Sequence, residues 1–293
     1  MTLPKPKSIT HQHLLGVINT LVLRAPVNRS TFYILDAGCG SGHFIHYLHR
    51  ALHFLHPEKQ FVIHGFDVSD HGVQSDGFLG EATRNLLTLD PDVDWSTRIY
   101  SLHQDQPWDF NDQQYDFIVS NQVLEHVRDK DKFFLNVSRK LTEGGYSVHL
   151  APLRSVIPED HVHIPFAHRF TNFGAMYAYI RMMSALGIGK FKHAKKSTGV
   201  DLETYSERHA DYLFHWTAYS SESETLQYAR KHFMRADFRF SLEFYTAKLS
   251  QMVGRKASIS YTFRARSFRD AVLIKLLRYL SSVTLVTEKK NTY

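Results

Sequence analysis

The first half of the chain alternates short apolar runs with longer runs of helical period, and this rhythm limits the possible folds more than any other feature. Strand-like runs are expected at residues 31–35, 61–66, 98–102, 115–120 and 146–151. Helical periods fall between them, at residues 44–55, 78–89 and 130–141. Strands that alternate with helices are typical of a parallel sheet covered on both faces. We therefore predict an α/β fold with a doubly wound, mostly parallel sheet, which binds ligands at the carboxyl ends of its strands.

The alternation stops after residue 152. Residues 154–235 are rich in histidine, aromatic and basic residues and contain no further strand–helix rhythm. Strands are expected again at 236–242 and 282–287, with a basic, apolar helix at 268–280. The sequence therefore predicts four parts. They are an N-terminal helical segment at 1–28, a Rossmann-like core with helices on both faces at 29–153, an inserted cap at 154–235, and C-terminal strands and a helix at 236–293 that complete the core.

The composition excludes several classes of protein. The 293 residues include one cysteine, which excludes a disulfide framework and a zinc or iron–sulfur site with several cysteine ligands in one chain. The net charge is +6, from 35 Lys and Arg and 29 Asp and Glu, and the cations are spread over the whole chain, so the sequence does not favour nucleic-acid binding. The apolar stretch 271–286 contains Lys275 and Arg278 and is too short to span a bilayer. We expect a cytoplasmic protein without a transmembrane segment, in a reducing compartment.

A glycine-rich turn follows the first predicted strand. The segment begins with Asp36 and places glycines at Gly38, Gly40 and Gly42, directly before a predicted helix. Glycine allows positive φ angles and lets a ligand approach the backbone closely. A dinucleotide fingerprint would have its third glycine at the position of His43. A pyrophosphate would be repelled by the nearby carboxylate, whereas a ligand that carries an ammonium and a sulfonium group would be attracted by it.

With this turn the sequence resembles the class I S-adenosylmethionine-dependent methyltransferases, of the type 11 or ubiquinone-biosynthesis-like kind, whose first motif is acidic-x-Gly-x-Gly-x-Gly. The resemblance covers residues 29–153, roughly half of the chain. It continues at Asp67, which ends the second strand where the family holds the adenosine ribose, and in the fourth-strand segment 115–127. The resemblance implies S-adenosyl-L-methionine as the cofactor and methyl transfer as the reaction.

The resemblance also assigns residues to the cofactor. A polar residue after the third strand would contact the adenine, with Asp105 as the first choice and Gln104 as the second. Asn121 would contact the methionine part through its backbone, while Glu125 and His126 would orient the loop. The full set of expected cofactor-binding residues is Asp36, Gly38, Cys39, Gly40, Gly42, Asp67, Val68, Gln104, Asp105, Asn121 and Gln122.

Candidate catalytic residues lie in the loop after the fifth strand. Methyl transfer needs an aligned acceptor and, for a hydroxyl acceptor, a base that removes the proton, but no protein nucleophile. Glu159, His161 and His163 are the candidates, and the two histidines would share a face if the loop is extended. An ordinary polar loop without a role in catalysis is one alternative, metal binding by these residues and Asp160 is a less favoured one, and we expect no metal. A second histidine set is expected on a solvated helix face, at His46, His49, His53 and His56.

The acceptor follows only by exclusion. Cys39 is the only cysteine and lies in the glycine turn, which argues against cytosine C5 and arsenic methylation, and no Asn/Asp-Pro-Pro-aromatic motif follows the fourth strand. We expect a small-molecule or glycan acceptor, methylated on a hydroxyl oxygen, with N- and C-methylation left open. The basic helix within residues 264–278 would suit peripheral contact with an anionic membrane. The alternatives are an RNA methyltransferase, a non-catalytic cofactor-binding subunit and a nicotinamide-dependent oxidoreductase.

Overall fold

The computed structural model describes residues 2–69, 78–89, 91, 93–103, 106–233, 235–255, 257–263 and 267–289. Its centre is a seven-stranded sheet in the order β3-β2-β1-β4-β5-β7-β6. The strands are β1 (Thr31–Ala37), β2 (Gln60–Val68), β3 (Ile99–Leu102), β4 (Tyr115–Asn121), β5 (Leu141–Ala151), β6 (Arg235–Asp237) and β7 (Val283–Glu288). The pairs among β1 to β5 are parallel, and β7 runs antiparallel to both β5 and β6. The predicted doubly wound, mostly parallel sheet is confirmed.

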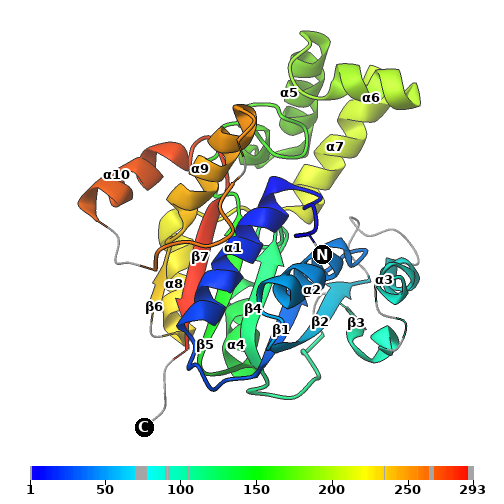
Figure 1. Ribbon diagram of the computed structural model, residues 1–293. Helices are drawn as coiled ribbons and strands as arrows, with labels where there is room; N and C mark the ends of the chain where they lie inside the picture. The colour runs from blue at the N-terminus through cyan, green and yellow to red at the C-terminus, as the bar shows by residue number, and fades with distance from the viewer. Residues whose placement is uncertain are drawn as a thin grey trace.

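Helices cover both faces of this sheet (Figure 1). α1 (Ile9–Arg24), α2 (His43–Leu55) and α9 (Ser241–Met252) lie on one face, while α4 (Lys130–Lys140) and α8 (Glu222–His232) pack together on the other. α3 (Phe78–Leu87) packs beside α2 and β3, and α10 (Phe268–Leu277) beside α9. The apolar residues of α1 are buried from Leu14 to Val22, which explains why this segment carries so long an apolar run. β1 and β4 are neighbours, so the order reverses between them and leaves a crevice where such sheets bind ligands.

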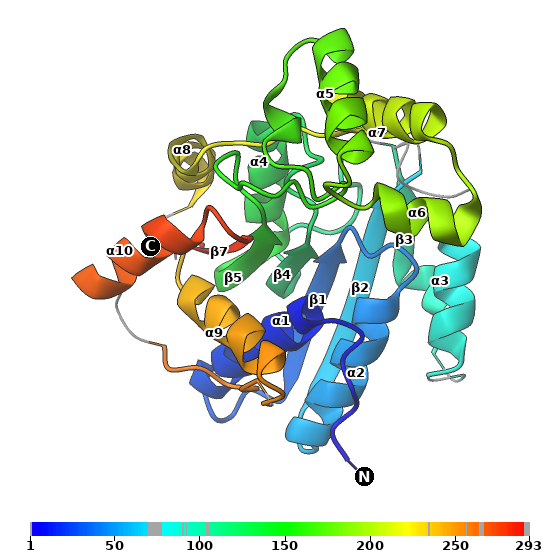
Figure 2. The ribbon, with the colours of Figure 1, turned by 90° about the horizontal axis from the view of Figure 1, so that it is seen from above.

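A second apolar cluster lies above the carboxyl ends of the strands. It joins the loop after β5 to α5 (Phe173–Ala185) and α7 (Leu202–Trp216), and its centre includes Val162, Ile180 and Leu213. α6 (Phe191–Thr198) links the two helices. These three helices lie above the end of the sheet in Figure 1, and the view from above shows them on the side of α4 and β3 (Figure 2). We call residues 154–218 the cap.

Two expectations about local structure are wrong. The strand expected at 236–242 ends at Asp237, and α9 begins at Ser241, because Phe240 takes a left-handed conformation that turns the chain. The helix face expected to be solvated is partly covered. The rings of His49 and His53 contact Trp95 and Phe61, at 6.0 and 5.5 Å between ring centroids.

His56, which was also expected to face solvent, lies in the core. It is buried, and its Nε2 lies 2.6 Å from the Oδ1 of Asn19 on α1. Burial lowers the pKa of His56 below its usual value, so this histidine is a neutral part of the core.

Candidate functional site

The glycine turn joins β1 to α2 by folding over the end of β2. Its three glycines have φ angles of +85°, +48° and +76°, which only glycine adopts without strain. The backbone N–H groups of Gly38 and Cys39 both donate to the carbonyl of Phe66, at 2.8 and 3.0 Å. A Cβ on Gly38 would lie 2.4 Å from Cγ2 of Val123, whereas a Cβ on Gly40 would meet only an oxygen of Asp67, 4.0 Å away. Packing against Val123 therefore requires a glycine at Gly38, whereas a side chain at Gly40 would enter the open space beside Asp67.

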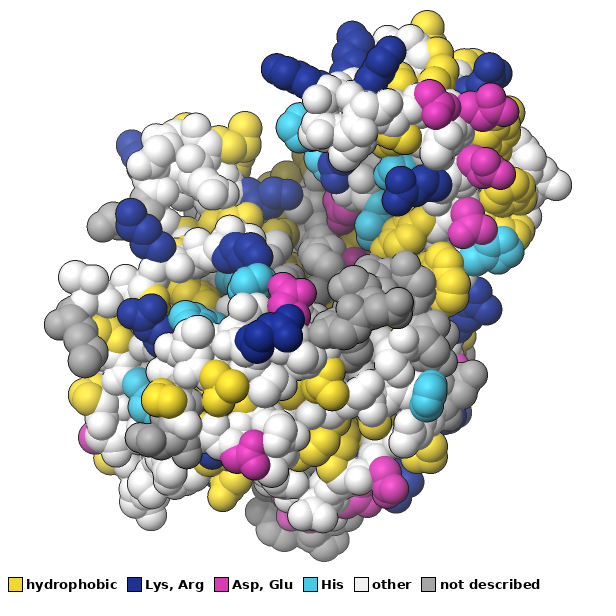
Figure 3. Space-filling model, turned by 90° about the vertical axis from the view of Figure 1, so that its right-hand side faces the viewer, with side chains coloured by type: hydrophobic (Ala, Val, Ile, Leu, Met, Phe, Trp, Pro, Cys, Tyr) yellow, Lys and Arg dark blue, Asp and Glu magenta, His cyan; other side chains and the backbone are white. Residues whose placement is uncertain are grey.

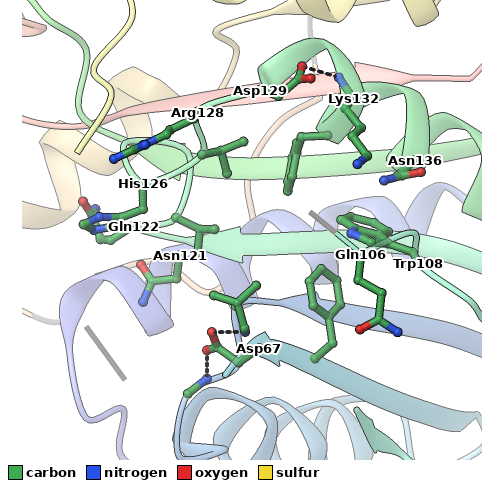
Figure 4. Close-up of a pocket in the computed structure, with 17 residues that line it drawn as sticks. Asp67, Gln106, Trp108, Asn121, Gln122, His126, Arg128, Asp129, Lys132 and Asn136 are labelled. Carbon is green, nitrogen blue, oxygen red and sulfur yellow. Dashed lines mark hydrogen bonds between the residues drawn. The ribbon is translucent and has the colours of Figure 1, made fainter. Parts of the chain in front are cut away.

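Asp67 fixes the geometry of this turn. Its Oδ2 accepts a hydrogen bond from the N–H of Gly40 at 2.6 Å, and its Oδ1 accepts one from the N–H of Val68 at 2.8 Å. The side chain is buried at the end of β2 and lies at one side of a cavity (Figure 4). Each carboxylate oxygen can accept more than one hydrogen bond, so the group can hold the turn and a ligand hydroxyl at once.

The cavity lies at the reversal of strand order and has a volume of about 320 Å³. Residues at the ends of β1, β2 and β4 form one side, and the loop between β4 and α4 forms another. Figure 4 shows Asp67, Trp108 and His126 around this space. The residues that line it are Gly38, Gly40, Phe66, Asp67, Val68, Gln106, Trp108, Asn121, Gln122, Val123, His126, Val127, Arg128, Asp129, Lys132, Phe133 and Asn136.

Trp108 and Gln106 provide the wall after β3. The Trp108 ring is nearly buried and lies 4.5 Å from the ring of Phe66 and 5.5 Å from that of Phe133. The predicted adenine contacts Gln104 and Asp105 lie outside the described residues. Sequence reasoning missed Trp108, although a lone tryptophan in a polar loop is a signal for such a wall.

A second hollow, of about 440 Å³, opens on the other side of the glycine turn. Gly38, Gly40 and Asn121 line both spaces, and Asp36 lines this one. Both carboxylate oxygens of Asp36 and Oδ1 of Asn121 are buried without a hydrogen-bond partner in the described part of the chain. Burial, together with the neighbouring Asp67, raises the pKa of Asp36 to about 8. A cationic group in this hollow would pair with Asp36 and favour its ionised form.

The start of α1 lies against the same hollow. Lys7, Ser8 and His11 line it, which the sequence alone did not indicate. The ring of His11 is buried, and burial lowers its pKa to about 4, so it is neutral. Cys39 also lines this hollow, and burial beside Asp36 raises the pKa of its thiol, so it is not a nucleophile.

The remaining predicted cofactor residues differ in position. Gln122 has a left-handed backbone at a φ of 58°, and its side chain donates to Oγ of Ser282 at 3.0 Å. Val68 and Gln122 line the first cavity. Gly42 lines neither space, because it precedes α2 and faces Leu86 of α3.

The loop after β5 is a tight turn built around Glu159. This carboxylate is completely buried and accepts hydrogen bonds from the N–H groups of His161 and Val162, both at 2.8 Å. It also accepts one from Nδ1 of His161 at 2.5 Å and one from the hydroxyl of Tyr219 at 2.8 Å. Burial alone would raise the pKa of Glu159, but these hydrogen bonds outweigh burial and hold the pKa below its usual value. Glu159 is therefore an ionised carboxylate.

The expectation that His161 and His163 share an extended face is wrong. His163 has a left-handed backbone, at a φ of 56°, and its N–H donates to the carbonyl of Glu159. Its side chain is exposed, while that of His161 is 26% exposed, and neither side chain lines either of the two spaces. The turn that brings two N–H groups to Glu159 is what separates the rings.

Contacts between aromatic rings connect His161 to the wall of the first cavity. Its ring lies 5.3 Å from that of His126, which lines the cavity, and 4.8 Å from that of Tyr212 on α7. Nδ1 of His126 donates to the carbonyl of Trp216 at 2.8 Å. Figure 3 shows a hollow between the cap and the core.

Glu125 lies beneath this junction. It is buried, and burial raises its pKa to about 8, so it holds a proton at neutral pH. Its backbone carbonyl accepts from the N–H of Ala218 at 2.6 Å, and Nζ of Lys130 donates to the carbonyl of Ala218, so the loop after β4 is tied to the cap. Sequence reasoning placed Glu125 and His126 correctly in this loop but did not place His126 in the cavity wall.

Within the described ranges, no three His, Cys, Asp or Glu side chains converge as metal ligands. A search of the same ranges for a helix with the length and hydropathy needed to cross a bilayer finds none.

Comparison with known proteins gives a family. A family model described as a methyltransferase domain matches residues 11–237, and no curated protein matches the chain. An S-adenosylmethionine-dependent methyltransferase from Mesorhizobium loti is similar in structure, at 16% identity over 92% of this chain and 96% of that chain, with a TM-score of 0.47. The YcgJ protein from Bacillus subtilis is 14% identical over 96% of this chain and 100% of that one, with a TM-score of 0.46.

A third similar structure covers a longer protein. The phosphoethanolamine N-methyltransferase 2 of Haemonchus contortus, in complex with S-adenosyl-L-methionine, is 12% identical over 96% of this chain and 52% of that one, with a TM-score of 0.46. At these identities and scores the structural likenesses carry no argument about an acceptor.

Proposed function

The chain belongs to the methyltransferase domain family, and from that premise we propose that it methylates a hydroxyl oxygen of a small-molecule or glycan acceptor. It is a class I S-adenosylmethionine-dependent methyltransferase, as the glycine turn indicated, and not a nicotinamide-dependent oxidoreductase. The observation that carries the proposed acceptor chemistry is the pair formed by Glu159 and His161, next to the wall of the cofactor cavity. Hydroxyl acceptors need a base, and this pair has the form of one.

The residues at the glycine turn fit the cofactor. When bound, S-adenosylmethionine supplies a methyl group on a positively charged sulfur. In our proposal Asp67 accepts hydrogen bonds from the ribose hydroxyls, and Gly40 leaves the space in which the cofactor passes the turn. The unpartnered oxygens of Asp36 and Asn121 receive the amino group of the methionine part. Trp108 and Phe66 hold the adenine in the apolar part of the cavity.

The two ring nitrogens of His161 have different roles in the proposed base. Nδ1 of His161 lies 2.5 Å from the ionised Glu159, so Nδ1–H donates a hydrogen bond to the carboxylate, which fixes the tautomer. Nε2 is then the nitrogen that can take a proton, as in the carboxylate-oriented histidines of many hydrolases. Tyr219 donates to the same carboxylate oxygen and holds it in place. His163 is left out of this set because its ring is exposed, whereas the ring of His161 is half-buried and lies 5.3 Å from that of His126 in the cavity wall.

The experiment is a transfer assay with labelled S-adenosylmethionine and a panel of hydroxylated small molecules, glycans, amines and RNA. We expect label in a hydroxylated compound, and a loss of kcat of about 100-fold or more in His161→Asn with unchanged affinity for S-adenosylhomocysteine. The matched control is His163→Asn, in the same turn, which should keep full activity.

The other outcomes decide against the proposal. Label found only in amines would make the acceptor atom nitrogen, and label found only in RNA would support the nucleic-acid alternative. Tight binding of S-adenosylhomocysteine without transfer to any member of the panel would favour a non-catalytic subunit.

A further inference from the structure

The exposed face of α10 has the wrong polarity for contact with water. Phe268, Val272 and Leu276 lie at intervals of four residues, so they form one stripe along the helix. Their exposed fractions are 87%, 41% and 62%. A helix on a protein surface normally turns its polar side chains outward and its apolar ones inward. Here the apolar stripe is solvent-exposed, while the only acidic residue of the helix, Asp270, is buried in a capping box with Ser267.

Cations flank this stripe. Arg269 and Lys275 are exposed on α10, and Arg278 directly follows the helix. The helix therefore presents apolar and basic side chains to solvent and no carboxylate. This is the pattern of helices that lie in the interface of an anionic bilayer, with the apolar side chains at the headgroup–acyl boundary and the cations among the headgroups.

A basic cleft continues from the end of α10. It has a volume of about 750 Å³ and lies between the cap, the start of α8 and α10. Five cations line it, from three separate parts of the chain: Arg154, Arg169, Arg230, Lys275 and Arg278. Among the described residues, Glu222 is the only carboxylate in its lining and pairs with Arg278, and Arg154 pairs with Glu224 outside the lining. α8 and α10 lie on the same flank of the molecule (Figure 2).

Lys275 belongs to both features, because it flanks the apolar stripe and also lines the cleft. The two features are therefore one continuous surface, which we call the basic–apolar flank. A soluble phosphate could occupy the cleft but would leave the apolar stripe in water. A second copy of the chain could cover the stripe, but a two-fold contact would oppose the cleft cations to one another. An anionic phospholipid surface matches both the charge and the apolar stripe.

We propose that this protein docks on anionic phospholipid membranes through the basic–apolar flank. The apolar stripe of α10 enters the boundary between headgroups and acyl chains, and the cleft cations bind lipid phosphates. The docking surface is separate from the cofactor cavity, since the two share no lining residue. The proposal therefore does not depend on the identity of the acceptor.

The test is flotation of the full chain with vesicles of phosphatidylcholine alone and of phosphatidylcholine mixed with phosphatidylserine. We expect flotation with the mixed vesicles, much less with the neutral ones, and release by salt. Leu276→Glu should abolish flotation, and Lys275→Glu should weaken it about fivefold or more, because each cation near an anionic surface contributes to binding.

Matched controls lie on the cap, where the same changes should have no effect. Leu186 is 70% exposed and Lys196 is exposed on α6, so Leu186→Glu and Lys196→Glu test whether added negative charge alone prevents flotation. All four variants should bind S-adenosylhomocysteine as the parent chain does, which shows that they fold.

Three results would overturn the proposal: no flotation of the parent chain, equal flotation with both kinds of vesicle, or equal loss in the cap controls. Where flotation is absent, two measurements identify another occupant. A dimer in sedimentation that Leu276→Glu dissociates would make the occupant a second copy of the chain. A Tm that inorganic phosphate raises in the parent but not in Lys275→Glu would make it a soluble phosphate.

Discussion

Replacing Asp67 by alanine tests how the cofactor is held. In the free protein, the two oxygens of Asp67 each accept one backbone hydrogen bond, from Gly40 at 2.6 Å and from Val68 at 2.8 Å. A carboxylate oxygen can accept more than one hydrogen bond, so the same group can also bind a ribose hydroxyl. A hydrogen bond to a charged group contributes about 1.5–3 kcal/mol net, and water in the emptied site recovers part of the two that are lost. We therefore expect Asp67→Ala to weaken binding by about 1–3 kcal/mol, or about 5- to 150-fold in Kd.

The assay is calorimetric titration with S-adenosylhomocysteine, together with thermal unfolding. Asp67→Ala should also lower Tm, because the N–H of Gly40 loses its acceptor. Asp67→Asn keeps an acceptor oxygen and should fall between the parent and the alanine variant. Asp94→Ala is the matched control. Asp94 accepts a backbone hydrogen bond from Ser96 at 3.1 Å, but it lines neither space at the site, so Kd should stay constant.

An unchanged Kd in a folded Asp67→Ala variant would refute the reasoning, because both the ribose contact and the support of the glycine turn by Asp67 require weaker binding. An equal loss in Asp94→Ala would attribute the effect to general destabilisation.

Three further predictions concern the same site. Gly40→Val should abolish binding of S-adenosylhomocysteine in calorimetry while the circular dichroism spectrum stays folded, because the new side chain points into the space at the turn; retained binding would place the cofactor elsewhere. Trp108→Ala should weaken binding about tenfold, through loss of the aromatic wall, and an unchanged Kd would exclude that wall. The pKa of Asp36 is raised to about 8, so the native state keeps a proton that the unfolded chain loses near pH 4. The free energy of unfolding of the cofactor-free protein should therefore fall between these pH values, by about 1.4 kcal/mol per unit, with a smaller slope in Asp36→Asn; urea titrations that give equal slopes would contradict the assignment.

The parts of the site that the sequence predicted are those that local geometry determines. The turn after β1 needs left-handed backbone at Gly38, Gly40 and Gly42, and few sequences other than a glycine run allow this. Asp67 follows from the strand that precedes it, since the carboxyl ends of neighbouring parallel strands meet at one edge. The order of the strands and helices was predictable because each run of residues shows the hydrophobic period of its own secondary structure.

The parts that the sequence did not predict depend on contacts between distant segments. Trp108 reaches the cavity by packing on Phe66, which is 42 positions earlier in the chain. The histidine face of α2 is partly covered because Trp95 contacts His49 and Phe61 contacts His53. His163 was mispredicted for a local reason instead, because the carboxylate of Glu159 accepts hydrogen bonds from the N–H groups of His161 and Val162 and forms a turn in place of the extended backbone. The cap helices have mixed aromatic and basic faces, so no clear hydrophobic periodicity predicted them from the sequence.

The central claim is that the glycine turn and Asp67 hold S-adenosylmethionine with its transferable methyl group toward the cap. The most direct test is a crystal structure of the chain with S-adenosylhomocysteine. Our account predicts the ribose hydroxyls on Asp67, the amino group beside Asp36, and the sulfur facing the side of the cavity where His126 and His161 meet. A nucleoside bound away from Asp67, or a sulfur directed away from His126, would contradict it.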